Sequence, residues 1–134
     1  MSTSRSKAQI TIEFVLILMT LLIFLTFFAH AVYLQLSQTY EKSIELETER
    51  IGNEVASQIN TAYESGSGYS KKYTLPDKLM NLDYNVSVNS AQGRIEISVR
   101  GAVSFFPIVT RNVSGNFTKG ENTIKNVEGL IKIE

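Results

Sequence analysis

One side chain stands out among the few in this 134-residue chain that could do chemistry. Glu13 is a single carboxylate at the start of an uncharged apolar run, residues 14–28. A charge at the border of a segment that can enter a membrane is costly to bury, and such residues usually have a function. Gln9 lies about one helical turn before it. Glu13 is therefore a candidate for pairing with a positive charge near the start of a helix.

Other catalytic or metal-binding side chains are scarce. The chain has no cysteine and one histidine, His30, which follows the apolar run. A thiolate zinc site, a disulfide and a Ser-His-Asp triad therefore lack their components. Asp77 and Asp83 have the character of loop and cap residues. We expect no enzymatic activity, no metal and no cofactor. The chain also lacks a basic run interleaved with aromatic residues, so no nucleic-acid partner is expected.

The apolar run is part of a longer segment, residues 9–35, that contains neither Gly nor Pro. Because about 20 apolar residues cross a bilayer as a helix, this segment can span a membrane. Residues 1–8 carry Arg5 and Lys7, a charge of +2, and are typical of a leader that stays in the cytoplasm. The sequence thus predicts a short leader, residues 1–8, before a membrane-inserted helix.

The helical pattern continues beyond the apolar segment. Apolar residues recur at steps of four or seven, with acidic residues between them: Leu36, Tyr40, Ile44, Ile51, Val55, Ile59 and Tyr63. This spacing predicts an amphipathic helix with one apolar stripe. Gly52 is its only weak point, and glycines at 66 and 68 are suited to terminate it. We expect a single helix over residues 9–64.

Residues 65–134 change to the alternating pattern of strands. We expect a hairpin of residues 84–89 and 94–100, strands at 102–106 and 108–113, a polar loop at 116–122, and a last strand at 124–133 bulged at Gly129. The apolar stripe of the helix and the apolar face of the sheet are each other's nearest cover. The predicted fold class is α+β: a long N-terminal α-helix with a small antiparallel β head domain packed on its C-terminal half, in the form of a lollipop.

The start of the chain resembles a known family. A short basic leader, then Gln9-Ile-Thr-Ile-Glu13, then an apolar helix, is similar to archaeal type IV pilin precursors with class III signal peptides. That family shows Gln-x-Ser-x-Glu; Thr11 stands where Ser is usual, and Ala8 is a small residue that suits the cut. The resemblance implies cleavage between Ala8 and Gln9 by a prepilin peptidase. Glu13 would then be the fifth residue of the mature chain.

The resemblance also implies a function and partners. The mature protein would be a structural subunit of a type IV-like adhesion pilus, a helical homo-oligomer held together by residues 9–35. Glu13 would pair with the amino terminus of a neighbouring subunit and set the axial register. A pilus assembly ATPase and a platform protein would act on the subunit. The precursor is expected in the cell membrane, and the mature filament outside the cell.

The same residues also fit an ordinary secretory signal. A basic start, the apolar run and Ala29-His30-Ala31 form the expected order, with the last three residues as the cleavage site. Cleavage after Ala31 would release a soluble binding module, and no cleavage would leave a membrane-anchored one. Glu13 at the mouth of the apolar run and the stripe that continues past Ala31 both favour the pilin.

Three Asn-x-Ser/Thr sequons lie in the predicted head, at Asn85, Asn112 and Asn116. A head outside the cell could carry N-linked glycans there. We expect modification at Asn112 and Asn116 rather than at Asn85, because Asn85 is predicted to lie in the middle of a strand.

Overall fold

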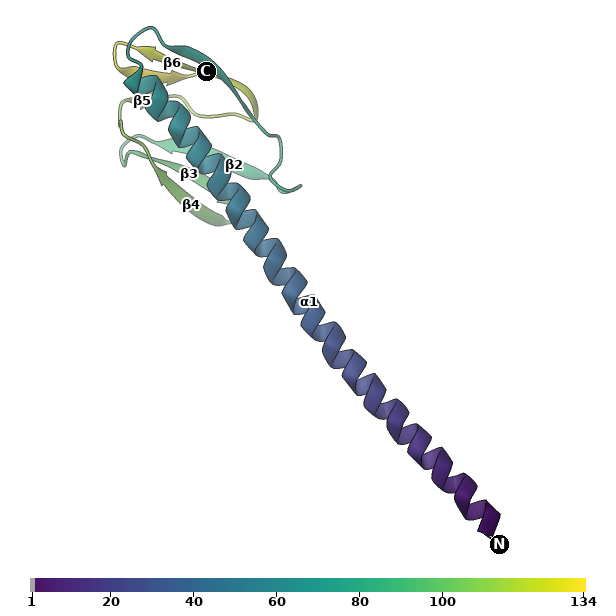
Figure 1. Cartoon of the computed structure of the whole chain (residues 1–134). Helices are drawn as coiled ribbons and strands as arrows, with labels where there is room; N and C mark the ends of the chain where they lie inside the picture. The colour runs from purple at the N-terminus through teal and green to yellow at the C-terminus, as the bar shows by residue number, and fades with distance from the viewer. Residues whose placement is uncertain (1) are drawn as a thin grey trace. The chain divides into compact units, whose positions relative to one another are not determined.

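The computed structural model describes the backbone from Ser2 and the side chains of residues 9–134 (Figure 1). One helix, α1, covers Ser2–Glu64 and ends at the residue where the sequence predicts its end. Strands follow it in the order β1 Ser70–Leu75, β2 Tyr84–Asn89, β3 Arg94–Val99, β4 Ala102–Pro107, β5 Val113–Ser114, β6 Gly120–Val127 and β7 Leu130–Ile133. The α+β class predicted from the sequence is confirmed. By packing, the chain divides into two units, Met1–Lys42 and Ser43–Glu134, so the end of α1 belongs with the strands.

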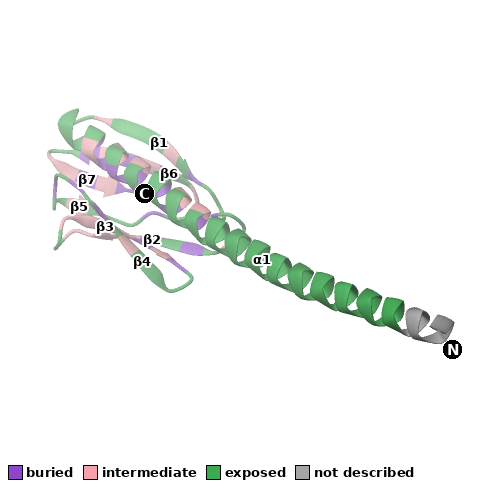
Figure 2. Cartoon of the chain, turned by 60° about the horizontal axis from the view of Figure 1, so that its bottom comes forward, coloured by how far each residue is buried: buried purple, intermediate pink, exposed green. Residues whose placement is uncertain are grey.

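The part of α1 in the second unit, residues 43–64, buries one stripe of its surface (Figure 2). The buried positions recur at steps of one, three or four: Ile44, Thr48, Ile51, Gly52, Val55, Ala56, Ile59 and Ala62. Tyr63, which the sequence placed on this stripe, is 46% exposed. Ala62 takes its place because a helix has 3.6 residues per turn, so repeated steps of four drift off the stripe. Leu36 and Tyr40 belong to the first unit and are exposed.

Gly52 allows the ring of Phe106 on β4 to lie directly against the helix backbone. A methyl group at Gly52 would lie 2.2 Å from Cε2 of Phe106, far inside van der Waals contact. Both residues are buried. A glycine in a helix costs about 1 kcal/mol relative to alanine. The residue that weakens the helix in the sequence is therefore the one that makes room for its contact with the sheet.

A three-stranded antiparallel sheet has the order β2-β3-β4. The predicted hairpin of β2 and β3 is confirmed, with Val86 opposite Ile97. Alternate residues of β3, namely Ile95, Ile97 and Val99, are buried, so one face of this sheet contributes to the core. Arg100 and Gly101 join β3 to β4 with φ angles of 50° and 86°, the left-handed backbone of a tight turn.

The second sheet has the order β1-β6-β7-β5 and is mixed. Strands β1, β6 and β7 pair antiparallel, whereas β5 pairs with β7 in parallel, with Val113 opposite Ile131. The head is therefore not purely antiparallel. The sequence prediction of one bulged strand over 124–133 is wrong, because Glu128 and Gly129 adopt φ angles of 53° and 86° and form a hairpin turn between β6 and β7.

Two other sequence predictions are wrong in this sheet. The predicted strand at 108–113 is a strand only at its last residue, because its backbone groups bond elsewhere. The Val109 N–H donates to Oδ1 of Asn60 on α1 at 3.0 Å, and the Ile108 N–H donates to the carbonyl of Gly93 at 3.0 Å. The predicted loop at 116–122 ends early, since β6 begins at Gly120. Strand β1 was not predicted.

The end of α1 is tied to the second sheet by a buried amide. Asn126 on β6 donates from Nδ2 to the carbonyl of Ala62 at 2.8 Å, and its Oδ1 accepts the Gly129 N–H at 2.9 Å. The last carbonyls of a helix have no partner within the helix. Asn126 satisfies one of them and holds the β6–β7 turn with the same side chain.

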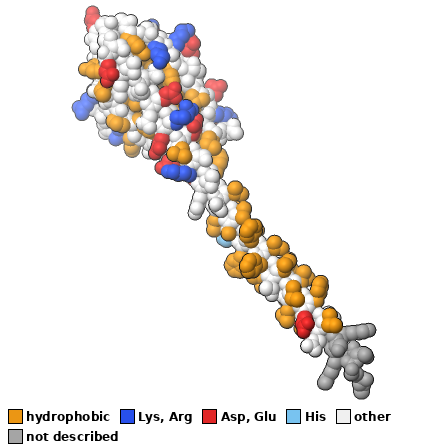
Figure 3. Space-filling model, viewed as in Figure 1, with side chains coloured by type: hydrophobic (Ala, Val, Ile, Leu, Met, Phe, Trp, Pro, Cys, Tyr) orange, Lys and Arg blue, Asp and Glu red, His pale blue; other side chains and the backbone are white. Residues whose placement is uncertain are grey.

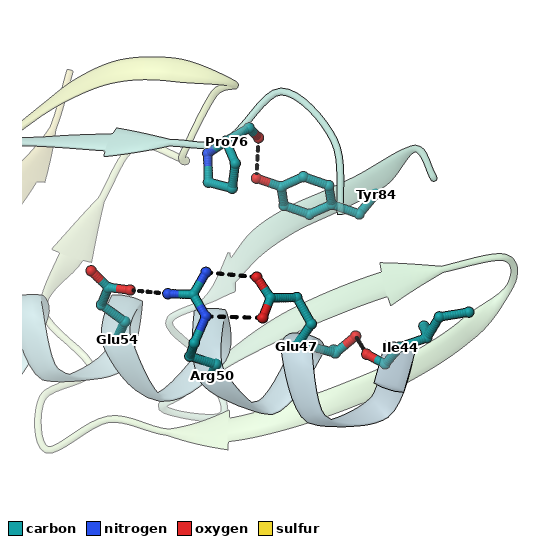
Figure 4. A network of polar contacts seen from close by, with 7 residues as sticks. Ile44, Glu47, Arg50, Glu54, Pro76 and Tyr84 are labelled. Atoms are coloured by element: carbon teal, nitrogen blue, oxygen red, sulfur yellow. Dashed lines mark hydrogen bonds and ion pairs between the residues drawn. The ribbon is translucent and has the colours of Figure 1, made fainter. Parts of the chain in front are cut away.

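The outer side of the packed part of α1 carries a charged network (Figure 4). Arg50 forms a two-point contact with Glu47, at 2.6 and 3.0 Å, and reaches Glu54 at 3.2 Å. The hydrogen bond from Arg50 lowers the pKa of Glu47 below its ordinary value. Burial, followed by the nearby Glu54 carboxylate, raises the pKa of Tyr73 on β1 to about 12. Tyr73 therefore keeps its phenol proton to a higher pH than an exposed tyrosine does.

Candidate functional site

The large apolar side chains of α1 between residues 9 and 42 are exposed, and Figure 3 shows them along the face in view. Across residues 14–28 the large apolar side chains are between 41% exposed, at Val15, and 76% exposed, at Phe24. Removing each such side chain from water stabilises a structure by about 1.5–3 kcal/mol. Exposed apolar surface of this extent marks a membrane or protein interface. Within Gln9–Glu64 the helix contains a stretch long and apolar enough to cross a bilayer.

The two threonines that interrupt the apolar surface are satisfied inside the helix. Thr20 donates its hydroxyl to the carbonyl of Leu16 at 2.8 Å, and Thr26 donates to the carbonyl of Leu22 at 2.8 Å. An unsatisfied hydroxyl in hydrocarbon carries a substantial free-energy penalty. Because both donors are used within the helix, neither threonine requires water, and the surface is compatible with lipid or with other apolar helices.

The same surface has ridges and a groove. Side chains at i, i+4 spacing form two rows with a groove between them, lined by Ile17, Thr20, Leu21, Phe24, Leu25 and Phe28. Rows of this spacing are the ridges that interlock when two helices pack against each other. Thr20 is the smallest residue of the set, so the side chains that line the groove are least bulky near its N-terminal end. The surface therefore has the relief that helix packing uses.

Gln9 and Glu13, which the sequence places one turn apart, do lie together. Nε2 of Gln9 donates to Oε1 of Glu13 at 3.5 Å, and both side chains are exposed. The carboxylate therefore lies within one turn of the nitrogen that would become the amino terminus after a cut before Gln9. Ala8, the other residue of the predicted cleavage site, lies outside the residues whose side chains are described.

Metal-ligating side chains are not gathered in the part of the chain whose side chains are described. Within residues 9–134, no three His, Asp or Glu side chains are placed to hold a metal ion. His30 is exposed on α1 just after the apolar run. Asp83 is exposed and pairs with Lys119 at 3.1 Å, and this contact lowers its pKa.

The three sequons lie on different parts of the head. Asn85 is the second residue of β2, so it lies within a strand as predicted, and its side chain is exposed. Asn112 precedes β5 and donates from Nδ2 to the carbonyl of Gly129 at 3.0 Å. Asn116 follows β5, and its Oδ1 accepts the Val88 N–H at 2.9 Å. All three asparagines are exposed, and they differ in the hydrogen bonds that their side chains make.

Sequence reasoning missed one hollow in the head. A pocket of about 400 Å³ lies beside Asn85, with Leu75, Val86 and Phe117 among its lining residues. These residues come from β1, β2 and the segment before β6, so no local spacing in the sequence signals the pocket.

No protein-family model, no curated protein and no solved structure matches the chain. The function is therefore inferred from these residues and their geometry.

Proposed function

We propose that the chain is the precursor of a pilin, a structural subunit of an archaeal type IV-like adhesion pilus. A prepilin peptidase cuts it before Gln9, and the mature subunit polymerises through residues 9–35. The observation that carries this proposal is the placement of Glu13, a carboxylate one turn from Gln9 at the foot of an exposed apolar helix surface. A plain membrane anchor or signal sequence has no use for a charge at that position.

The exposed surface of α1 explains how one helix can serve in two settings. In the membrane, residues 14–28 face lipid, and in the filament they face the helices of neighbouring subunits. Their apolar area stays out of water in both places, so the transfer does not expose it. The internal hydrogen bonds of Thr20 and Thr26 remain intact throughout. The i, i+4 ridges supply the relief by which neighbouring helices interlock.

Glu13 supplies the register of the polymer. Cleavage before Gln9 creates a positively charged amino terminus, and Glu13 of one subunit pairs with the amino terminus of its neighbour. Inside an apolar core, removing one member of such a pair costs about 3–5 kcal/mol, because the other charge is left uncompensated. Only subunits in the correct axial position satisfy both charges, so the pair selects that position. The assembly ATPase and the platform protein act on the processed subunit in the membrane.

Intact mass of the mature protein tests the processing. Loss of residues 1–8 supports the pilin, and loss of residues 1–31 excludes it. An additional loss of ammonia from Gln9 would report cyclisation, which removes the amino-terminal charge that the pairing needs. The abundance of the chain in purified filaments then separates a major subunit from a minor one.

Substitution of Glu13 tests the pairing. Subunits with Glu13→Ala are expected to be processed but to be largely absent from filaments. Glu49→Ala is the matched control, since Glu49 is an exposed carboxylate on the second unit of the same helix, away from the apolar surface. Normal assembly of the Glu13→Ala subunit would remove the pairing from the mechanism.

A non-polymerising extracellular binding module, secreted or membrane-anchored, is the second candidate. The observation that favours it is the small-residue sequence Ala29-His30-Ala31 at the end of the apolar run. These three residues lie within α1, whose hydrogen-bonded turns continue to Glu64. Gln9 lies within α1 as well, so the helix does not distinguish this cut from one before Gln9, and the intact mass decides between them.

A further inference from the structure

We propose that β4 is a docking edge for a second copy of this chain, and that heads of two filaments lying side by side pair there, β4 against β4, in antiparallel register about Ser104. The inference rests on the proposed function in requiring that many heads are displayed in a row along a polymer. It is carried by three observations: the open edge of β4, the apolar side chains beside it, and the protection of the other sheet edges.

Strand β4 leaves a row of backbone groups without a strand partner. It is the last strand of the order β2-β3-β4 and lies at the margin of the head (Figure 1, Figure 2). A two-residue turn joins it to β3, with Val99 opposite Ala102. In such a hairpin the two residues that flank the turn bond to each other, and the direction of bonding then alternates along the strand. The N–H and C=O groups of Val103 and Phe105 therefore point away from β3.

The side chains beside this edge are apolar and exposed. Val103 and Phe105 are 47% and 53% exposed, and they share the outer face of the strand because side chains alternate along it. The guanidinium carbon of Arg94 on β3 lies 4.0 Å from the centre of the Phe105 ring, a cation–π contact that holds the ring in place. Arg94 also pairs with Glu96 at 2.9 Å, so the charge beside the ring is neutralised.

The other edge strands of the two sheets are protected against such pairing. On β1, Lys71 and Lys72 are exposed, and lysines on an edge oppose the addition of a second strand. On β2, the Val88 N–H is already bonded to Oδ1 of Asn116 at 2.9 Å. Strand β5 has only two residues, too few to template a partner. Strand β4 contains no charged residue, and its one proline, Pro107, is its last residue. Among the edges of the described sheets, β4 lacks these protections.

A second β4 strand is the partner that fits this edge. A two-fold axis at Ser104 places Val103 of one copy opposite Phe105 of the other, and does so twice. Each such pair exchanges both of its backbone hydrogen bonds. It also sets a β-branched side chain against an aromatic ring, which is a favourable cross-strand pair. Because a two-fold contact is closed, it does not extend a filament, and it joins heads that belong to two different filaments.

The small size of the contact determines where it holds. A stable complex in solution buries about 1,200–2,000 Å² of surface, and a contact centred on two exposed side chains of each copy is well below that. Heads that are free in solution are therefore expected to stay monomeric. Filaments side by side present many β4 edges in series, and each contact that forms raises the effective concentration for the next. The edge is therefore expected to bundle filaments.

A charge placed on the edge tests the docking in purified filaments. Val103→Lys sets like charges close to the two-fold axis, so the bundles that sediment at low speed are expected to be lost and single filaments to appear in electron micrographs. Val127→Lys is the matched control, because Val127 is 43% exposed on β6 and is expected to leave the bundles unchanged. Wild-type filaments that stay single overturn the proposal, and so do Val103→Lys filaments that bundle as the wild type does.

Single cysteines test the register, because the chain has no cysteine of its own. In the proposed pairing the two copies of Ser104 are directly opposite, with Cα atoms about 4.5 Å apart, within the range that a disulfide bridges. Ser104→Cys filaments oxidised with diamide are expected to give a disulfide-linked dimer on denaturing electrophoresis. Ala102→Cys is the control, since Ala102 is the more exposed residue but lies opposite Phe106 of the second copy. Equal yields of dimer from the two variants, or no dimer from Ser104→Cys, overturn the register.

The failure of this contact is distinguishable from the failure of the proposed function. A chain that is cut before Gln9 and whose filaments stay single overturns the β4 contact and leaves the pilin intact. A mature chain that lacks residues 1–31 and forms no filaments overturns both, because no row of heads then exists.

Discussion

Two stretches of α1 differ in whether their apolar side chains are exposed or buried. In residues 9–42 every side chain of α1 is exposed, including aromatic residues such as Phe24 and Phe27. In residues 43–64 a single stripe is buried, and Ile51, Val55 and Ile59 are at most 1% exposed. The backbone is the same continuous helix in both. The difference lies in how the apolar residues are distributed around it.

The distribution shows what covers each stretch. A stripe needs a cover on one side, and the two sheets of the same chain provide it. A helix that is apolar on all sides needs a cover on all sides, which one small head of the same chain is not built to give. The apolar residues of 43–64 therefore serve the fold of the subunit itself. Those of 9–42 serve contacts with its surroundings, which we propose are lipid and then other subunits.

Truncating one apolar residue in each stretch tests this comparison most strongly. Ile51→Ala is expected to lower the free energy of unfolding of the head by about 2–5 kcal/mol, because it leaves a cavity in a closed core. Leu21→Ala removes a comparable side chain from an exposed position and is expected to leave that free energy unchanged. Denaturant unfolding in detergent, followed through the tyrosines of the head, measures both. Equal losses would mean that the first stretch is also part of the core of the subunit.

Adding one methyl group sharpens the comparison. Gly52→Ala improves helix propensity by about 1 kcal/mol, but the new methyl group overlaps the buried ring of Phe106. We expect a net loss of about 1–3 kcal/mol in the free energy of unfolding, as for other overpacked cores. Ala31→Val adds bulk in the exposed stretch and is expected to leave the head unaffected. A stabilised Gly52→Ala protein would show that β4 is free to shift.

The smallest expected effect concerns pH and the outer side of the packed stretch. The hydrogen bond from Arg50 holds the pKa of Glu47 below its ordinary value of 4.5, so the pair stabilises the folded head above pH 4.5. This stabilisation is lost as pH falls through the lower folded-state pKa. Glu47→Gln is expected to cost about 0.2–0.5 kcal/mol at neutral pH and nothing at strongly acidic pH. Unfolding curves at several pH values measure it, with Glu49→Gln as the control, and a cost that persists in acid would contradict the ionic origin.

The helix and the β2–β3 hairpin could be predicted because their signals are local. The burial of Ile44, Ile51, Val55 and Ile59 follows from their spacing along the helix. Strand β1 was missed because only Tyr73 and Leu75 face inward from it, too few for a recognisable alternation. Residues 108–113 alternate like a strand, with Ile108 and Thr110 buried, but their backbone bonds to α1 and to Gly93 instead of a ladder.

The candidate sites divide in the same way. Gln9 and Glu13 are one turn apart on one helix, so their contact follows from sequence spacing alone. The hydrogen bonds of Asn112 and Asn116 do not, because their partners Gly129 and Val88 are distant in sequence. The role of Gly52 could not be predicted for the same reason. The sequence shows that a glycine lies in the helix, but not that the ring of Phe106 packs against it.

The contact between Gly52 and Phe106 has a mechanical consequence. Sliding α1 along its axis by one turn, about 5.4 Å, would bring the buried Thr48 or Ala56 to the place that Gly52 occupies. Either side chain would collide with the ring, so the contact opposes sliding of α1 along its axis. A pulling force along α1 is then transmitted to β4 at the contact between Gly52 and Phe106. The sheets therefore move together with the helix.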